Sequence, residues 1–90
     1  MPYALPSPMK ITSVTVRPPL QLDVVFEDGC RLVVQFEPCR LSGLLEPLLE
    51  PVEFSAAYLR DGTVRWPCGA WLDAQLARIK ADEGPVWRPA

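Results

Sequence analysis

Histidine is absent from this chain of 90 residues. Histidine is the side chain that most often serves as a general acid or base, and as a metal ligand, near neutral pH. Without it the chain cannot form Ser-His or Cys-His nucleophile pairs. We therefore expect a protein that is not an enzyme and that binds no cofactor.

A cysteine framework is missing as well. Cys30, Cys39 and Cys68 are odd in number and irregularly spaced, which is not the pattern of a disulfide framework. No Cys-x-x-Cys pair is present, and a closed zinc site needs four ligands. We expect reduced, partly buried thiols and no metal site.

Long apolar runs are missing. No stretch reaches the roughly 18 apolar residues that a membrane-spanning helix needs. The first residues also lack the basic region followed by an apolar region that marks a secretory signal. We expect no membrane association and a cytoplasmic location.

Basic residues are not in excess: 9 lysines and arginines stand against 11 acidic residues, for a net charge of −2. Phosphate contacts supply most non-specific affinity for nucleic acids, so direct nucleic-acid binding is not expected. Arg65-Trp66 and Trp87-Arg88 do place cations beside stacking rings. The alternative function is therefore a nucleic-acid-associated regulator that acts through a partner.

The composition, with 49% hydrophobic residues, predicts a single globular domain. A chain of this size buries roughly 60–65% of its unfolded surface, so extra burial against a partner would matter. We expect residues 1–8 to be a flexible leader, residues 9–81 to form the domain, and residues 82–90, with one glycine and two prolines, to be a flexible tail. Another small protein, or a second copy in a homodimer, is the expected partner.

Strand patterns dominate the first half. Residues 10–16 are rich in β-branched side chains and predict an opening strand. Apolar residues then alternate with mostly polar ones from Leu20 to Phe26 and from Leu32 to Phe36, on either side of Asp28-Gly29. This pattern predicts an antiparallel hairpin with both apolar sets on one face.

The middle of the chain favours a short Leu-rich helix. Leucines recur at spacings of three and four over residues 41–49, although Pro47 is tolerated only in a first turn and Pro51 should lie beyond the end. Glu46 and Glu50, four residues apart, could form a carboxylate pair. With no acid/base partner nearby in sequence, we interpret them as a solvated face.

A second hairpin is predicted from Phe54 onwards. The alternation of Phe54, Ala56 and Tyr58 suggests a strand that turns at Asp61-Gly62 into a strand over residues 63–66.

Residues 70–72 suggest a further pairing segment. Asp73 is a suitable N-cap for a C-terminal helix, and we expect that helix to turn Leu72, Leu76 and Ile79 toward the sheet. The predicted fold class is α+β: two antiparallel hairpins and an opening strand, with two helices packed on the sheet.

The chain resembles a family of small bacterial domains, domain of unknown function 2442, over about residues 9–76. The resemblance is carried by the opening strand with its proline, the hairpin with an acidic-Gly turn, a Pro-Leu-rich segment and a Gly-Thr-Val-x-Trp-Pro-x-Gly-Ala stretch. These are Lys10 to Pro18, the turn at Asp28-Gly29, Leu44 to Phe54, and Gly62 to Ala70.

The resemblance implies a mixed α+β fold and no established biochemistry. Family members are sometimes joined to a helix-turn-helix domain or encoded beside small proteins in arrangements like toxin–antitoxin pairs. Members often carry Asn where Cys68 stands and Asp where Trp71 stands, and Asp73-Ala74 replaces an acidic-Pro pair. An activity that depends on those polar positions is not expected here.

The expected function is protein–protein interaction or regulation, with an antitoxin-like role. The candidate surface comprises Arg65, Cys68, Trp71 and Trp87, since aromatic residues and arginine are favoured at interface centres. Trp66, on an apolar strand, is expected in the core. A thiol-dependent enzyme with Cys68 as nucleophile is the third alternative, but no general base lies near it in sequence.

Overall fold

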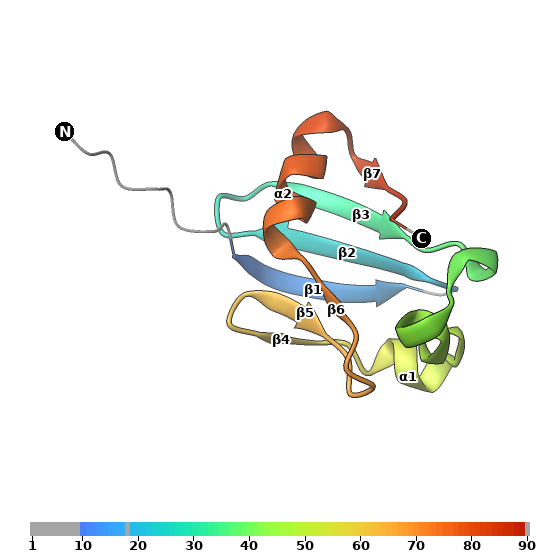
Figure 1. The fold of residues 1–90 in the computed structure, drawn as a ribbon. Helices are drawn as coiled ribbons and strands as arrows, with labels where there is room; N and C mark the ends of the chain where they lie inside the picture. Colours follow the sequence, from blue (N-terminus) through green and yellow to red (C-terminus); the bar gives the residue numbers. More distant parts are fainter. Residues whose placement is uncertain (1–9, 18, 90) are drawn as a thin grey trace.

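The computed structural model describes residues 10–17 and 19–89 (Figure 1). The predicted leader, residues 1–8, lies outside them. The described chain forms two sheets, two α-helices and two 3-10 segments, which confirms the predicted α+β class. In chain order the elements are β1 (Ile11–Arg17), β2 (Gln21–Phe26), β3 (Arg31–Gln35), η1 (Pro38–Arg40), η2 (Gly43–Leu49), α1 (Pro51–Ser55), β4 (Tyr58–Arg60), β5 (Thr63–Arg65), β6 (Trp71–Leu72), α2 (Ala74–Glu83) and β7 (Val86–Trp87).

The larger sheet has the strand order β1-β2-β3-β7. Strands β1, β2 and β3 are antiparallel, and Val24 pairs with Val14 on one side and Leu32 on the other. The β2–β3 hairpin turns at Asp28-Gly29, as predicted. Its apolar side chains share one buried face, also as predicted, and they include Leu22, Val24, Phe26, Leu32 and Val34.

The smaller sheet has the order β4-β5-β6. The β4–β5 hairpin turns at Asp61-Gly62, where both residues have positive φ, 53° and 78°. Asp and Gly tolerate that region, which a two-residue hairpin of this type needs. The predicted second hairpin is confirmed, and in the predicted pairing segment over residues 70–72 the last two residues pair with β5.

Helix α2 lies over the buried face of the larger sheet and contacts β3 and β7 (Figure 1). Asp73 caps it as predicted, because its Oδ1 accepts the backbone N–H groups of Gln75 at 3.0 Å and Leu76 at 3.1 Å.

The predicted inward face of α2 is wrong. Leu76 and Ile79 are exposed by 41% and 51%, and the inward stripe consists of Ala74, Ala77 and Ala81. These alanines are three and four residues apart and share one helical face, while Leu76 and Ile79 lie on the opposite one. Small side chains at the contact let the helix axis approach the sheet closely.

The segment from residue 43 to residue 57 also differs from its prediction. Segment η2 is a 3-10 helix with Pro47 inside it, and Pro51 begins α1 instead of following the end of a helix. Proline suits a first helical position because its φ is already helical and its missing N–H would have no intrahelical partner. Phe54 is therefore a buried helical residue, and strand β4 begins only at Tyr58.

Part of the predicted flexible tail, residues 82–90, forms secondary structure. Helix α2 continues to Glu83, and Val86 and Trp87 pair in parallel with Val33 and Val34. The Val33 N–H also donates to the Pro85 carbonyl oxygen at 2.9 Å. The C-terminal segment thus extends the larger sheet.

Three aromatic rings join the end of β3, helix α1 and the end of β5. Phe36 meets both Phe54 and Trp66 edge-on, and Phe54 stacks on Trp66 with ring centroids 5.9 Å apart. Trp66 is 2% exposed, which confirms its predicted place in the core.

Candidate functional site

Two of the predicted surface residues lie side by side on the smaller sheet. Arg65 in β5 is directly opposite Trp71 in β6 on one side and Tyr58 in β4 on the other. Residues opposite one another in antiparallel strands project from the same face. Because Trp71 is 57% exposed and Tyr58 41% exposed, this face presents a row of ring, guanidinium and ring to solvent.

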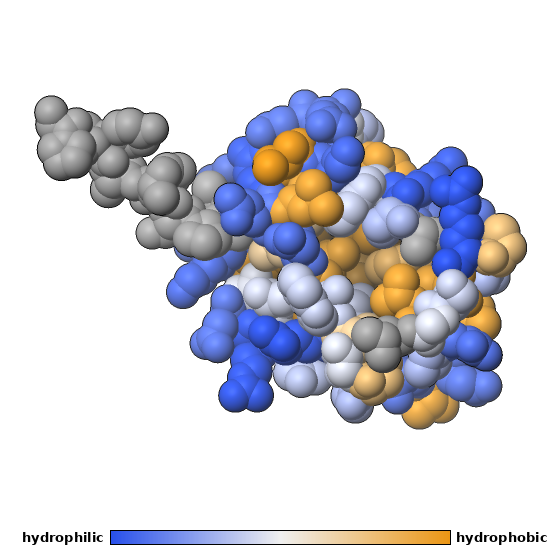
Figure 2. Space-filling view, in the orientation of Figure 1, coloured by the Kyte–Doolittle hydropathy of each residue, from blue (hydrophilic) through white to orange (hydrophobic). Residues whose placement is uncertain are grey.

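Trp71 also borders an apolar groove of about 540 Å³ between β6, α2 and the β7 region. Its walls include Leu76 from α2 and Trp87 from β7, together with Phe36 and Leu45. Figure 2 shows this face, with apolar side chains over α2 and in the hollow beside it. The structure therefore brings Trp71 and Trp87 to one concave surface, although they are 16 positions apart in the sequence.

Charged side chains border the same groove. Lys80 from α2 and Arg88, directly after β7, are cationic, and Asp73 contributes a carboxylate. Lys80 Nζ lies 3.4 Å from Glu83 Oε1, a long contact on an exposed part of the helix. Such exposed pairs contribute little, so the ammonium remains available to another anion.

Cys68 is separate from this surface. It is half-buried in the turn after β5, packs against the core and does not line the groove. Its backbone N–H donates to Glu53 Oε2 at 2.9 Å. The turn is closed further by the Gly69 N–H, which donates to the Trp66 carbonyl oxygen at 2.9 Å. The position of Cys68 thus reflects turn formation and packing.

Leu76, Lys80 and Leu45 line the groove and were not among the predicted site residues. The sequence did contain a signal for the two on α2. Ala74, Ala77 and Ala81 recur at helical spacing, and a stripe of small residues can face a closely packed sheet. With that stripe on the inward face, Leu76 falls on the outward face of the helix.

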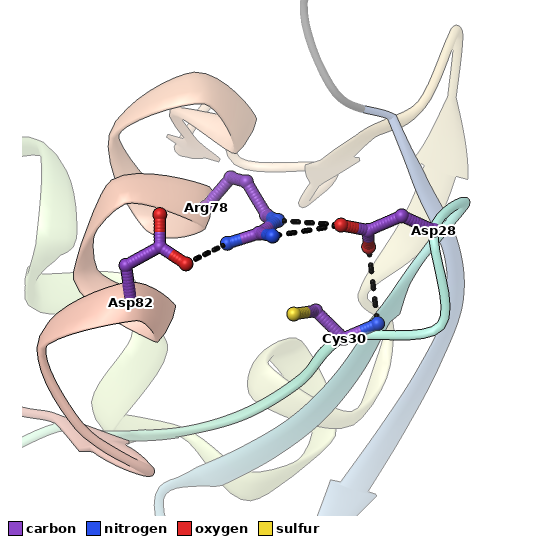
Figure 3. Close-up of polar contacts among 4 residues, drawn as sticks. All are labelled: Asp28, Cys30, Arg78 and Asp82. Carbon is purple, nitrogen blue, oxygen red and sulfur yellow. Dashed lines mark hydrogen bonds and ion pairs between the residues drawn. The ribbon is translucent and has the colours of Figure 1, made fainter.

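Apart from the groove, a polar cluster of Asp28, Cys30, Arg78 and Asp82 lies where α2 crosses the β2–β3 turn (Figure 3). Arg78 donates through Nε and Nη2 to Asp28 Oδ2, at 3.1 and 2.7 Å, and through Nη1 to Asp82 Oδ1 at 2.6 Å. The other oxygen of Asp28 accepts the backbone N–H of Cys30 at 3.0 Å. The Arg78 guanidinium carbon also lies 5.9 Å from the centre of the Phe26 ring.

These contacts shift the ionisation of the cluster. The hydrogen bond from the Cys30 N–H and those from Arg78 lower the pKa of Asp28 below its usual value. The carboxylates of Asp82 and Asp28 raise the pKa of Arg78. Since the polar groups of the cluster bond to one another, we interpret it as a structural link between α2 and the hairpin.

The three free thiols differ in their exposure. Cys30 and Cys68 are half-buried, as expected, whereas Cys39 is exposed, contrary to the prediction. Residues 10–17 and 19–89 contain no group of three His, Cys, Asp or Glu side chains placed to hold a metal ion. Over those same residues, no helix combines the length and apolar character needed to cross a membrane.

Comparisons of the chain with family models, curated proteins and solved structures found no match. The resemblance to domain of unknown function 2442 therefore remains a prediction, and the functional argument depends on the surface itself.

Proposed function

We propose that the chain is a non-enzymatic interaction module that binds another small protein, or a second copy of itself, through the groove between Trp71 and Trp87. A regulatory role in the cytoplasm, of the antitoxin-like kind that the family resemblance implies, is part of the proposal. The observation that carries it is the meeting of two tryptophans from separate elements at one apolar hollow.

Exposure supports this interpretation. Trp71 and Leu76 are exposed by 57% and 41% although both border the groove. Covering apolar surface yields roughly 25 cal/mol per Å², so a partner seated here would gain from area that the monomer leaves in water. Apolar surface rimmed by polar groups is typical of interaction sites. Tryptophan is also among the residues that most often dominate binding energy.

Affinity purification of the full chain from its native host at endogenous levels tests the proposal. We expect one small protein to be retained by the wild type and lost with Trp71→Ala and with Leu76→Gln. Val52→Gln is the matched control, because Val52 is an apolar residue of α1 that is 84% exposed and does not line the groove. Light scattering on the same variants detects binding to a second copy.

The proposal would be contradicted by two results together. The wild type and both groove variants would retain the same proteins, and the groove variants would keep the oligomeric state of the wild type. Circular dichroism of each variant checks that the fold is intact. Because Trp71 and Leu76 are exposed, we expect little change in stability from either substitution.

A further inference from the structure

The charge around the groove differs in sign from the charge of the whole chain. The chain carries a net charge of −2. Among the described residues that line the groove, the charged ones are Lys80, Arg88 and Asp73, two cations and one carboxylate. Arg65 adds a further cation beside Trp71 on the neighbouring sheet. A groove lined in this way favours an anionic ligand through charge complementarity.

The Asp73 carboxylate weakens this preference less than its formal charge suggests. Its Oδ1 accepts two backbone N–H groups at the start of α2. The first turn of a helix carries about half a positive charge, which offsets part of the negative charge of the capping carboxylate. The two cations are less offset: Arg88 is exposed, and among residues 10–17 and 19–89 the ammonium of Lys80 has only the long contact with Glu83.

The size of the groove limits what can enter it. A volume of about 540 Å³ lies within the range of roughly 300–1,000 Å³ that is usual for ligand pockets. That volume suits a few side chains of a partner. The apolar walls from Trp71, Leu76 and Trp87 would receive large apolar side chains, and Lys80 and Arg88 would meet carboxylates beside them.

We propose that the groove binds an acidic segment of a partner protein, in which large apolar side chains that enter between Trp71 and Trp87 are flanked by carboxylates that pair with Lys80 and Arg88. The inference rests on the proposed interaction function and specifies the chemistry of the partner.

The test uses a library of random peptides displayed on phage, selected against the immobilised full chain. Selected peptides are synthesised with a fluorophore, and their affinities are measured by anisotropy at low and high salt. We expect sequences enriched in Asp and Glu next to Leu, Phe or Trp, and binding that weakens as salt screens the charges.

Charge reversal then locates the contact. Lys80→Glu and Arg88→Glu should each weaken binding about three- to tenfold, because reversal removes a weak attraction and adds a repulsion of similar size. Arg31→Glu is the matched control with the same change in charge. Arg31 lines a separate hollow on the opposite face of the larger sheet, so its substitution should leave the affinity unchanged. Equal losses in all three variants would assign the effect to overall charge and overturn the proposal.

Two other outcomes distinguish this proposal from the proposed function. If selected peptides bind the wild type, lose at least tenfold in affinity with Trp71→Ala, and are neutral or basic, the acidic partner is refuted while the interaction function stands. If peptide binding is unaffected by both Trp71→Ala and Leu76→Gln, the groove is not a binding site and both proposals fail. Circular dichroism and the unfolding midpoint of each variant show that the fold is retained.

Discussion

Trp66 donates its indole N–H to the carbonyl oxygen of Phe54 at 3.0 Å, and the two rings stack with an interplanar angle of 30°. The contact joins helix α1 to the residue that directly follows β5, the second strand of the β4–β5 hairpin. Because the indole is buried, its N–H needs a protein partner, and the end of α1 supplies one. The Trp-Pro-Cys-Gly stretch therefore serves the fold, with Trp66 as its anchor.

Replacing Trp66 by phenylalanine should lower the free energy of unfolding by about 1–3 kcal/mol, from the lost hydrogen bond and a partly unfilled cavity. The Phe54 carbonyl also accepts the Ala57 N–H at 3.3 Å, so it keeps one partner in the variant. Urea unfolding followed by circular dichroism measures the change. Trp71→Phe is the control, because Trp71 is exposed and should change the stability by less than about 0.5 kcal/mol. Equal losses in the two variants would contradict the assignment of Trp66 as the anchor.

Much of the fold could be predicted because local chemistry and tertiary structure agree there. Around Asp28-Gly29 the turn residues and the alternation of apolar side chains specify the same hairpin. Phe54 shows where this fails: its spacing from Ala56 and Tyr58 fits a strand, but the φ that Pro51 fixes starts a helix one turn earlier. The alternation of apolar residues continues for too few residues there to distinguish a strand from a helix.

The candidate site was harder to predict because it is assembled from distant segments. Trp71 and Trp87 were identified as surface candidates, but their meeting depends on β7 pairing with β3. Strand β7 consists of only Val86 and Trp87, which is too short for the alternating pattern by which strands are predicted from sequence. Predicting the groove also requires knowing which face of α2 packs on the sheet. That face is formed by alanines and not by leucines.

The Asp28 carboxylate, which accepts the Cys30 N–H and pairs with Arg78, should make stability depend on pH in the acid range. The pKa of Asp28 is lower in the folded protein than in the unfolded chain. As the pH falls, the unfolded chain therefore takes up this proton before the folded protein does. The stabilisation is therefore fully present above the unfolded pKa of about 3.9 and is lost as the pH falls through the folded pKa. Asp28→Asn should lower Tm at pH 7, and the difference from the wild type should shrink toward pH 2.

Asparagine keeps an oxygen that can accept the Cys30 N–H, so this variant tests the charge and leaves the turn intact. Calorimetric Tm values at a series of pH values measure the effect. If the two curves of Tm against pH stay parallel from pH 7 to pH 2, ionisation of Asp28 makes no contribution to stability.

The cap of α2 should be measurable by substitution. Asp73→Ala removes the acceptor for the Gln75 and Leu76 N–H groups and should lower the free energy of unfolding by about 1 kcal/mol. For a domain of this size that corresponds to a decrease in Tm of about 4–8 °C. Asp73→Asn keeps a capping oxygen, so its Tm should fall much less. A similar loss in both would mean that the charge, and not the cap, supplies the stabilisation.

Thiol accessibility separates the interaction function from a thiol-dependent reaction. Cys39 is exposed, while Cys30 and Cys68 are half-buried and pack against the core. A thiol reagent at neutral pH should therefore label Cys39 fastest. Mass spectrometry of samples digested at successive times assigns a labelling rate to each cysteine. Faster labelling of Cys68 than of Cys39 would support the alternative of a thiol-dependent enzyme.

Gly62 should be the turn glycine least able to accept a side chain. Its φ of +78° disfavours other residues, and an added Cβ would lie 2.5 Å from the Lys10 Cβ and 3.1 Å from the Lys10 Cα. The Gly62 carbonyl oxygen also accepts the Ile11 N–H at 2.9 Å, so a displaced turn would break the contact between the second hairpin and β1.

Gly29→Ala supplies a matched control for Gly62→Ala. Gly29 has a similar φ of +87°, but nothing lies within 4 Å of its added Cβ. Gly29→Ala should lower the free energy of unfolding by about 1–2 kcal/mol, the cost of a left-handed non-glycine residue. Gly62→Ala should lower it by that amount and by about a further 1–3 kcal/mol for the steric overlap. Urea unfolding of the two variants measures the difference, and equal losses would show that the hairpin moves away from Lys10 without cost.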